Sequence, residues 1–260
     1  MNPRGQAAVE SALTLPLVVF CFLGFLQLGA LMNARVLAQY AVWKAARAGA
    51  IEQGSCRAIV HTALAVLMPA ISRVDTSTRL ADQFALRKNN AYDPMSDGGH
   101  DGQIFEVVRE RPLASEIALV PGDGEDLFFD QPVGGDLNTR AEPLRLELRA
   151  VFWFRMRIPF ANWVISRILQ AHYGIQDYAA QNPLMISQTA KWKSDNVRLT
   201  RVGDDWPGGP LENSMSGWAA NRQYLLPIRV TATLRMLSAA RVDFFANGKA
   251  CPLGPPWPGY

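Results

Sequence analysis

The stretch "RGQAAVESALTLPLVVFCFLGFLQLGALMNARV", residues 4–36, decides the fold that we predict for this chain. From Leu13 to Met32 it carries no formal charge. A helix of that length rises about 30 Å, the thickness of the hydrocarbon core of a bilayer. Pro16 lies within the run and would weaken a soluble helix, but a membrane helix tolerates it. We therefore predict a transmembrane span over about residues 13–32.

The residues after the span continue the helical pattern instead of forming a cleavage site. A secretory signal would have a shorter apolar core followed by a small-x-small site. Two faces recur at helical spacing, one of Val36, Tyr40, Trp43 and Arg47 and one of Ala34, Ala38, Ala41, Ala45 and Ala48. The pattern favours one long helix over residues 6–54, ending near Gly49 or Gly54. The alternative is two helices with a bend near Asn33.

The charges around the span leave its orientation open. Arg4 precedes the span, whereas Arg35, Lys44 and Arg47 follow it. Taken literally, this count keeps the rest of the chain in the cytoplasm, but long domains cross membranes largely regardless of charge.

The composition argues against several classes of function. The net charge of +3 over 260 residues is too small to indicate a nucleic-acid partner, and no basic patch with interleaved aromatic residues occurs. His61, His100 and His172 lack metal-ligand spacing, and neither a G-x-S-x-G elbow nor a phosphate-binding glycine loop is present. We therefore expect no enzyme, no cofactor and no metal site.

Three aspartates in a glycine-rich segment invite comparison with a calcium loop. Asp93, Asp97 and Asp101 are four residues apart. A calcium loop needs oxygen ligands at alternate positions and a late glutamate. The spacing favours ordinary turn chemistry.

The three cysteines allow one disulfide outside the span. Cys21 lies within the apolar run, so Cys56 and Cys251 form the remaining pair. A bridge between them requires an oxidising compartment, and two free thiols are the alternative.

The rest of the chain predicts an α+β domain with short helices and an antiparallel sheet. Apolar and polar residues alternate over residues 144–158 and again over 226–236, which predicts two strands that pair in one sheet. Helical patterns cover 55–73, with Ser55 as candidate N-cap, and 160–174.

Three further expectations concern this domain. The sequence predicts a loop over residues 89–136, which are rich in glycine, proline, aspartate and asparagine. Weaker strand candidates lie near Ile186 and Val197. The outer half of the long helix is expected to pack on the apolar face of the sheet. Trp153 lies on the polar face of its strand and is a candidate exposed contact residue.

Glu10 follows a short basic leader that ends in Gly5, and it is the fifth residue after that glycine. This order resembles a type IV prepilin processing site, where a membrane prepilin peptidase cuts after the glycine. The resemblance implies a cut between Gly5 and Gln6. The new amine at Gln6 would be positive and close to lipid, so Glu10 of the same or a neighbouring subunit would pair with it and set the register between helices.

The wider stretch resembles the N-terminus of TadE-like proteins, the pseudopilins of tight-adherence (Tad/Flp) pilus systems. The matching positions are Arg4, Gly5, Ala8, Val9, Glu10, Leu15, Pro16, Ala45, Arg47 and Gly49. Ser11 departs from the pattern, because the family usually has an aromatic residue there.

The resemblance implies a pilin-like molecule in the bacterial inner membrane. Residues 1–5 would be the leader, residues 6–54 the long helix with a cytoplasmic N-terminus, and residues 55–260 a periplasmic domain. The chain would be a minor pseudopilin, and its partners would be other pilins through the N-terminal helix and the prepilin peptidase. The alternative is an unprocessed single-pass anchor that carries a periplasmic binding or scaffold domain.

Overall fold

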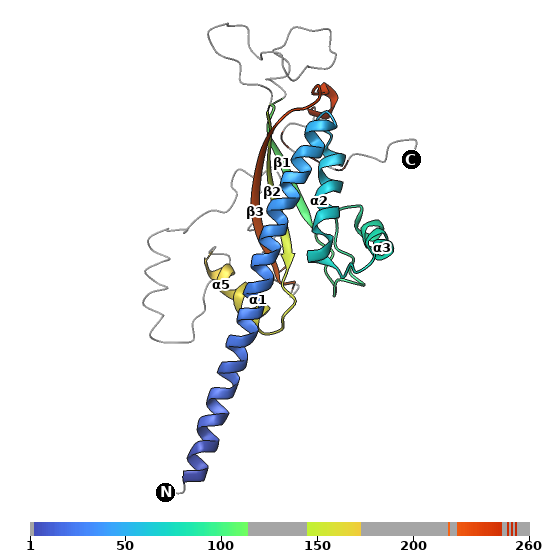
Figure 1. Cartoon of the computed structure of the whole chain (residues 1–260). Helices are drawn as coiled ribbons and strands as arrows, with labels where there is room; N and C mark the ends of the chain where they lie inside the picture. Colours follow the sequence, from blue (N-terminus) through green and yellow to red (C-terminus); the bar gives the residue numbers. More distant parts are fainter. Residues whose placement is uncertain are drawn as a thin grey trace, which may run out of the picture. The chain divides into compact units, whose positions relative to one another are not determined.

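The computed structural model of the chain has an α+β fold with one long N-terminal helix, several short helices and a three-stranded antiparallel sheet (Figure 1). The structure describes residues 3–113, 145–172, 218, 223–245, 249, 251 and 253. The chain divides into two compact units. Unit 1 consists of Met1–Met32 and Arg155–Leu226, and unit 2 consists of Asn33–Phe154 and Pro227–Tyr260. The fold class predicted from the sequence is confirmed.

Helix α1 runs without interruption from Pro3 to Ile51. One continuous helix is therefore assigned over these residues. The helix ends where Gln53 and Gly54 adopt φ angles of 56° and 86°, and the Gly54 amide donates to the Gly49 carbonyl at 2.7 Å. A Cβ atom at Gly54 would overlap the Phe245 ring, so both the backbone angle and the space require glycine there.

The sheet has the order β1-β2-β3, with β1 at Phe105–Arg111, β2 at Arg145–Arg155 and β3 at Leu225–Arg235. Strands β1 and β2 are antiparallel, and Phe105 faces Phe152. The two strands predicted from alternating residues are thus confirmed as neighbours in one sheet. The prediction of loop over residues 89–136 is wrong at β1.

Three short helices and a 3₁₀ turn complete the described chain. They are α2 (Cys56–Ile71), α3 (Ser77–Arg87), α5 (Ala161–His172) and η1 (Val242–Phe245). The helices predicted over 55–73 and 160–174 are confirmed, whereas α3 was not predicted. Ser55 occupies the N-cap position of α2, but its side chain makes no capping hydrogen bond. At α3 the Thr76 side chain does cap, accepting from the Arg79 amide at 3.2 Å.

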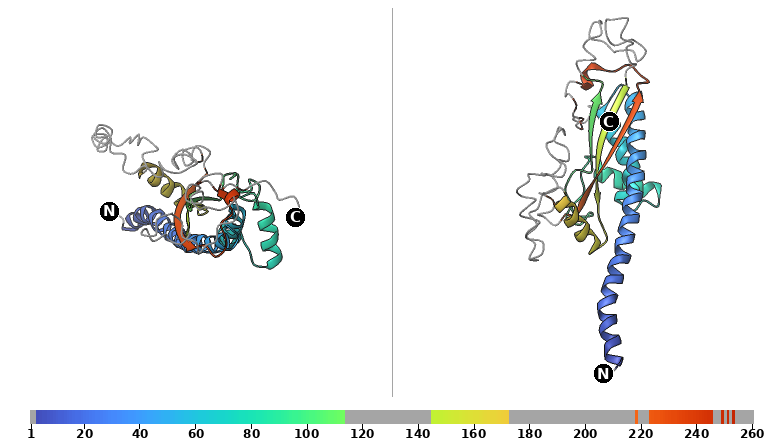
Figure 2. Two further views of the ribbon diagram at one scale, coloured as in Figure 1. Left: turned by 90° about the horizontal axis from the view of Figure 1, so that it is seen from above. Right: turned by 90° about the vertical axis from the view of Figure 1, so that its left-hand side faces the viewer.

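In unit 2 the outer half of α1 packs closely on α2 and the sheet. Gly49 marks the closest approach, because a Cβ there would lie 2.6 Å from Ile59 and 2.9 Å from Leu146. Figure 2 shows β3 running along this part of α1, and the Gln39 side-chain amide donates to the Thr231 carbonyl at 2.9 Å. The predicted packing of this half-helix on the sheet is confirmed.

Strand β2 departs from strict alternation in its second half. Residues 150–154 are all buried, so both faces of the strand are covered there. Trp153 is fully buried, and its indole Nε1 donates to Glu106 Oε1 at 3.1 Å. The Trp153 amide donates to the Ile104 carbonyl at 2.9 Å, and the Tyr92 hydroxyl donates to the Trp153 carbonyl at 2.5 Å. The expectation of an exposed Trp153 is therefore wrong, because both faces of β2 are covered at this position.

The strand candidates near Ile186 and Val197 lie outside the residues that the structure describes. The same holds for residues 114–136 of the predicted loop.

Candidate functional site

The predicted processing residues lie in the first turns of α1. Gly5 and Gln6 follow its first residue, Pro3. Glu10 is exposed, and its backbone carbonyl accepts a hydrogen bond from the Thr14 hydroxyl at 2.9 Å. The position of Glu10 on a helix places it about one turn from Gln6. Their roles in cleavage and register stay predictions.

The inner section of α1 presents large apolar side chains outward. Between Leu15 and Met32 the exposed ones are Leu15, Leu17, Val18, Val19, Phe20, Phe22, Phe25, Leu26, Leu28 and Met32. Among the described residues, α1 is the one helix long and apolar enough to cross a membrane, judged by length and composition. An apolar surface of this size marks contact with a membrane or with another protein.

The outer section of the same helix, residues 33–51, buries small side chains and exposes large ones. Its alanines are buried, namely Ala34, Ala38, Ala41, Ala45, Ala46 and Ala50. Its large side chains face outward, with Tyr40 and Trp43 stacked 6.5 Å apart and the Lys44 ammonium above both rings. The face formed by the alanines is therefore packed within unit 2, and the face that carries Tyr40 and Trp43 is exposed.

One polar side chain breaks the exposed apolar surface of the inner section. Gln27 is buried, with 1% of its surface exposed. Its Oε1 accepts from the Ile158 amide at 3.1 Å, and its Nε2 has no hydrogen-bond partner within the described part of the chain. This contact lies within unit 1 and joins α1 to the segment that connects β2 to α5.

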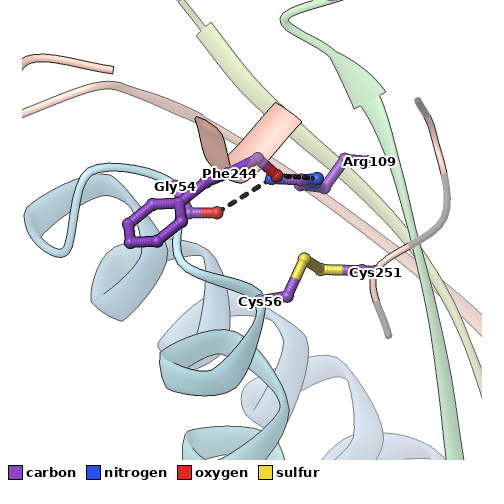
Figure 3. The surroundings of a disulfide bond; sticks show 5 residues. All are labelled: Gly54, Cys56, Arg109, Phe244 and Cys251. Atoms are coloured by element: carbon purple, nitrogen blue, oxygen red, sulfur yellow. Dashed lines mark hydrogen bonds between the residues drawn. A yellow bond between two sulfur atoms is a disulfide. The ribbon is translucent and has the colours of Figure 1, made fainter. Parts of the chain in front are cut away.

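The pair Cys56 and Cys251 forms a disulfide in the structure (Figure 3). The bond joins the first residue of α2 to the chain's C-terminal tail, across a sequence separation of 195 residues. The tail also contacts β1 directly, because the Arg109 amide donates to the Lys249 carbonyl at 2.9 Å. This is the pair that the cysteine count leaves outside the membrane span, and Cys21 is free and exposed.

Arg109 lies beside the disulfide and holds three segments together (Figure 3). Its guanidinium donates to the carbonyls of Gly54 at 3.0 Å and Phe244 at 2.5 Å, and it lies over the Phe245 ring. Burial lowers the pKa of Arg109 to about 10, so the group stays charged at neutral pH. The Gly54 carbonyl follows the C-terminus of α1, where the helix dipole favours a cation.

The acidic segment after α3 is built as a structural turn. Asp97 is buried and forms an ion pair with buried Arg87 at 2.9 Å. The Asp93 carboxylate accepts from the Ser96 hydroxyl at 2.6 Å, which is the main reason that its pKa lies below the ordinary value. Asp101 is exposed at the end of this segment. Within the described part of the chain, no three His, Cys, Asp or Glu side chains gather in a way that could hold a metal ion.

A shallow pocket of about 370 Å³ lies beside the tail in unit 2. Its lining is Asn89, Asn90, Ala91, Gln103, Cys251 and Leu253. The Asn90 side chain donates to the Phe105 carbonyl at 2.6 Å and accepts from the Phe105 amide at 3.0 Å. Its polar atoms are therefore committed to holding the chain before β1, and the pocket offers no acid–base or nucleophilic group.

The N-terminal part of the chain matches a known protein family. Residues 5–47 match the family described as TadE-like protein. No curated protein and no solved structure matches the chain. The resemblance drawn from the N-terminal motifs is confirmed over these residues, and it indicates a role connected with Tad-type pili. The matched segment includes Gly5, Gln6, Glu10, the inner section of α1 and the outer section as far as Arg47.

Proposed function

We propose that this chain, whose residues 5–47 match the TadE-like family, is a minor pseudopilin of a Tad/Flp-type pilus or a related secretion fibre. The observation that carries the proposal is the division of one helix into two surfaces. The inner section exposes large apolar side chains, while the outer section is built into a folded unit by its alanines. A subunit made in this way can leave its inner section in lipid or pack it against the same section of another subunit.

The chain itself is the substrate in the first step of this role. A prepilin peptidase cuts between Gly5 and Gln6 and leaves Gln6 with a free α-amine. The N-terminus faces the cytoplasm, the inner section of α1 crosses the inner membrane, and unit 2 lies in the periplasm. The disulfide between Cys56 and Cys251 supports this orientation, because such bonds persist in oxidising compartments.

Glu10 acts after the cut, as the partner of the new amine. A charge left unpaired close to hydrocarbon is costly, so two helices that pair amine and carboxylate are held at one axial register. The partners in the fibre are other pilins and pseudopilins, and the protein works as a structural component, not as a catalyst.

Removing the Glu10 carboxylate tests this function. We expect Glu10→Ala to reduce the amount of this chain in sheared fibres by roughly tenfold or more, because the amine loses its partner. The measurement compares sheared and membrane fractions on immunoblots. Ser11→Ala is the matched control, since it changes a neighbouring side chain without a charge.

Equal incorporation of Glu10→Ala and Ser11→Ala at equal membrane levels would contradict the register role. If neither the native chain nor the control reaches the fibre fraction and both keep residues 1–5, the chain acts instead as an unprocessed membrane anchor for a periplasmic binding or scaffold domain.

A further inference from the structure

The buried side chain of Gln27 ties a second segment of unit 1 to the membrane-crossing helix. The Ile158 amide donates to Gln27 Oε1 at 3.1 Å. Ile158 belongs to the turn that leads from β2 into α5, and Asn162 and Val164 begin α5 by donating to the carbonyls of Ile158 and Phe160. The start of α5 therefore lies at the level of Gln27 along α1.

This contact limits how far the hydrocarbon layer extends along α1. An irregular backbone segment does not lie exposed in hydrocarbon, because its amide groups would lack hydrogen-bond partners. Gln27 comes seventeen residues after Glu10. At 1.5 Å per residue this spacing is about 25 Å, which is close to the thickness of a hydrocarbon core. The outer boundary of the bilayer then falls near Gln27, and Met32 lies beyond it.

The outward face of α5 and its preceding turn is apolar and aromatic. The exposed fractions are 71% for Phe160, 49% for Trp163 and 61% for Ile168. In α5, Trp163 and Ile168 lie about 140° apart at 100° per residue and bound its exposed side, with the exposed Arg167 between them, and Phe160 lies in the turn just before the helix. Ala161 and Ser166 flank this exposed side and are buried, with exposed fractions of 1% and 6%.

The charges of this segment suit a lipid surface. Residues 155–172 contain three arginines, at 155, 157 and 167, and no aspartate or glutamate. A short amphipathic helix with a tryptophan, large apolar residues and basic residues is typical of segments that lie in the plane of a bilayer interface. Tryptophan in particular concentrates at the level of the headgroups.

The backbone conformation of Phe160 is a second, independent indication that this side of the segment contacts something outside the chain. Phe160 has a φ angle of 66°, a left-handed conformation that is rare and costly for a bulky residue. Glycine would satisfy such a turn with less strain. A large apolar side chain that is both strained and 71% exposed is accounted for if it contacts something outside the chain.

We propose that residues 156–169 form a membrane-interface element. The segment lies on the outer surface of the bilayer that α1 spans and inserts Phe160, Trp163 and Ile168 among the upper acyl chains. The proposal rests on the proposed function, because it needs α1 to be in a membrane. Its consequence is that the subunit is held at the membrane by two elements, and that extraction into a fibre must release both.

Depth measurements on the full chain test the proposal. The chain is reconstituted in vesicles of phosphatidylethanolamine and phosphatidylglycerol, and an environment-sensitive fluorophore is attached to one cysteine at a time. Native Cys21 is free and exposed and reports the span. Ile168→Cys and the matched control Leu86→Cys, an exposed leucine of α3, are made with Cys21→Ser.

We expect a quencher near the acyl chain ends to reduce the emission of the Cys21 label. We expect a quencher near the headgroups to reduce the emission of the label at residue 168. The label at residue 86 should lose emission only to aqueous iodide. Phe160→Gly should lessen the lipid quenching at residue 168, without loss of the Cys56–Cys251 bond on non-reducing gels.

The two proposals fail in different ways. If the Cys21 label is quenched by lipid while the label at residue 168 behaves like the one at residue 86, the interface element is overturned and the membrane span stands. If residue 168 is shielded from both iodide and lipid quenchers, protein covers this face, and the proposal is equally overturned. If Cys21 itself is not quenched by lipid, the membrane span fails and the interface element fails with it.

Discussion

The two sections of α1 share one helical backbone but meet opposite surroundings. Before residue 33 the large apolar side chains point outward, and after it the alanines point inward, onto α2 and the sheet. Alanine allows close backbone approach within a folded unit, whereas leucine and phenylalanine supply the surface that lipid or another helix covers. The position of the large side chains, and not the helix itself, separates the section that assembles from the section that folds.

Cysteine substitutions in or next to the two sections should differ most in their effect on the stability of unit 2. Cys56 lies just beyond the outer section and bonds to Cys251, whereas Cys21 is free in the inner section. Removing a bond that closes a long loop costs about 2–5 kcal/mol in general. We expect Cys56→Ser to lower the urea midpoint of unit 2 accordingly and Cys21→Ser to leave it unchanged. Urea titration of the detergent-solubilised chain, followed by amide exchange in β1 and β2, measures both.

Equal midpoints for the two cysteine variants would contradict a stabilising role for the bond.

Two glycines of α1 offer a smaller contrast with the same chemical change. A Cβ at Gly49 would lie 2.6 Å from Ile59, whereas nothing lies within 4 Å of one at Gly24. Gly49→Ala should therefore destabilise unit 2 by about 1–3 kcal/mol through overpacking. Gly24→Ala should leave unit 2 unchanged, while its section gains the better helix propensity of alanine. The same urea titration distinguishes them, and a Gly49→Ala chain as stable as Gly24→Ala would show that the close contact can relax.

The smallest expected effect is a pH dependence confined to unit 2. Burial, assisted by the charge of Arg57 and opposed by a backbone hydrogen bond at Lys88, lowers the pKa of His61 below its ordinary 6.5. The folded chain then binds this proton less readily than the unfolded chain, so stability falls as the pH drops through about 6.5. His61→Phe, which keeps an aromatic ring against Phe84, should remove this part of the pH dependence.

Urea midpoints of the native chain and His61→Phe at about pH 7.5 and about pH 5.5 bracket the ordinary histidine range and measure the difference. The same fall in both proteins would assign the pH effect to other groups.

The sequence predicted those parts of the fold whose signals are local. The apolar run predicted the inner section of α1, the alanine spacing its buried outer face, and alternating residues the strands β2 and β3. Each of these patterns repeats over many residues, so it predicts an element even where a single residue does not fit.

The parts that were missed depend on distant contacts. Strand β1 is short and contains the buried Arg109, a residue type expected on the surface. The carbonyl groups that accept from its guanidinium lie 55 and 135 residues away in the sequence, so no local sequence pattern indicates that Arg109 is buried. Trp153 was misplaced for the same reason, because its indole partner Glu106 is 47 residues away in the sequence.

The candidate site divides in a similar way. Gly5, Gln6 and Glu10 were found from their order alone, because a processing motif is a short linear feature. The contact between Gln27 and Ile158 was not, since it joins residues 131 positions apart. Gln27 is one of few polar residues in the apolar run, and that isolation was the available signal.

The intact mass of the mature chain tests the central claim most directly. The chain is purified from membranes of a host that has its prepilin peptidase and, in parallel, from one that lacks it. Processing after Gly5 predicts a chain that begins at Gln6 in the first host and one that retains residues 1–5 in the second. A chain that retains Gly5 in both hosts would contradict processing and, with it, the role as a pseudopilin.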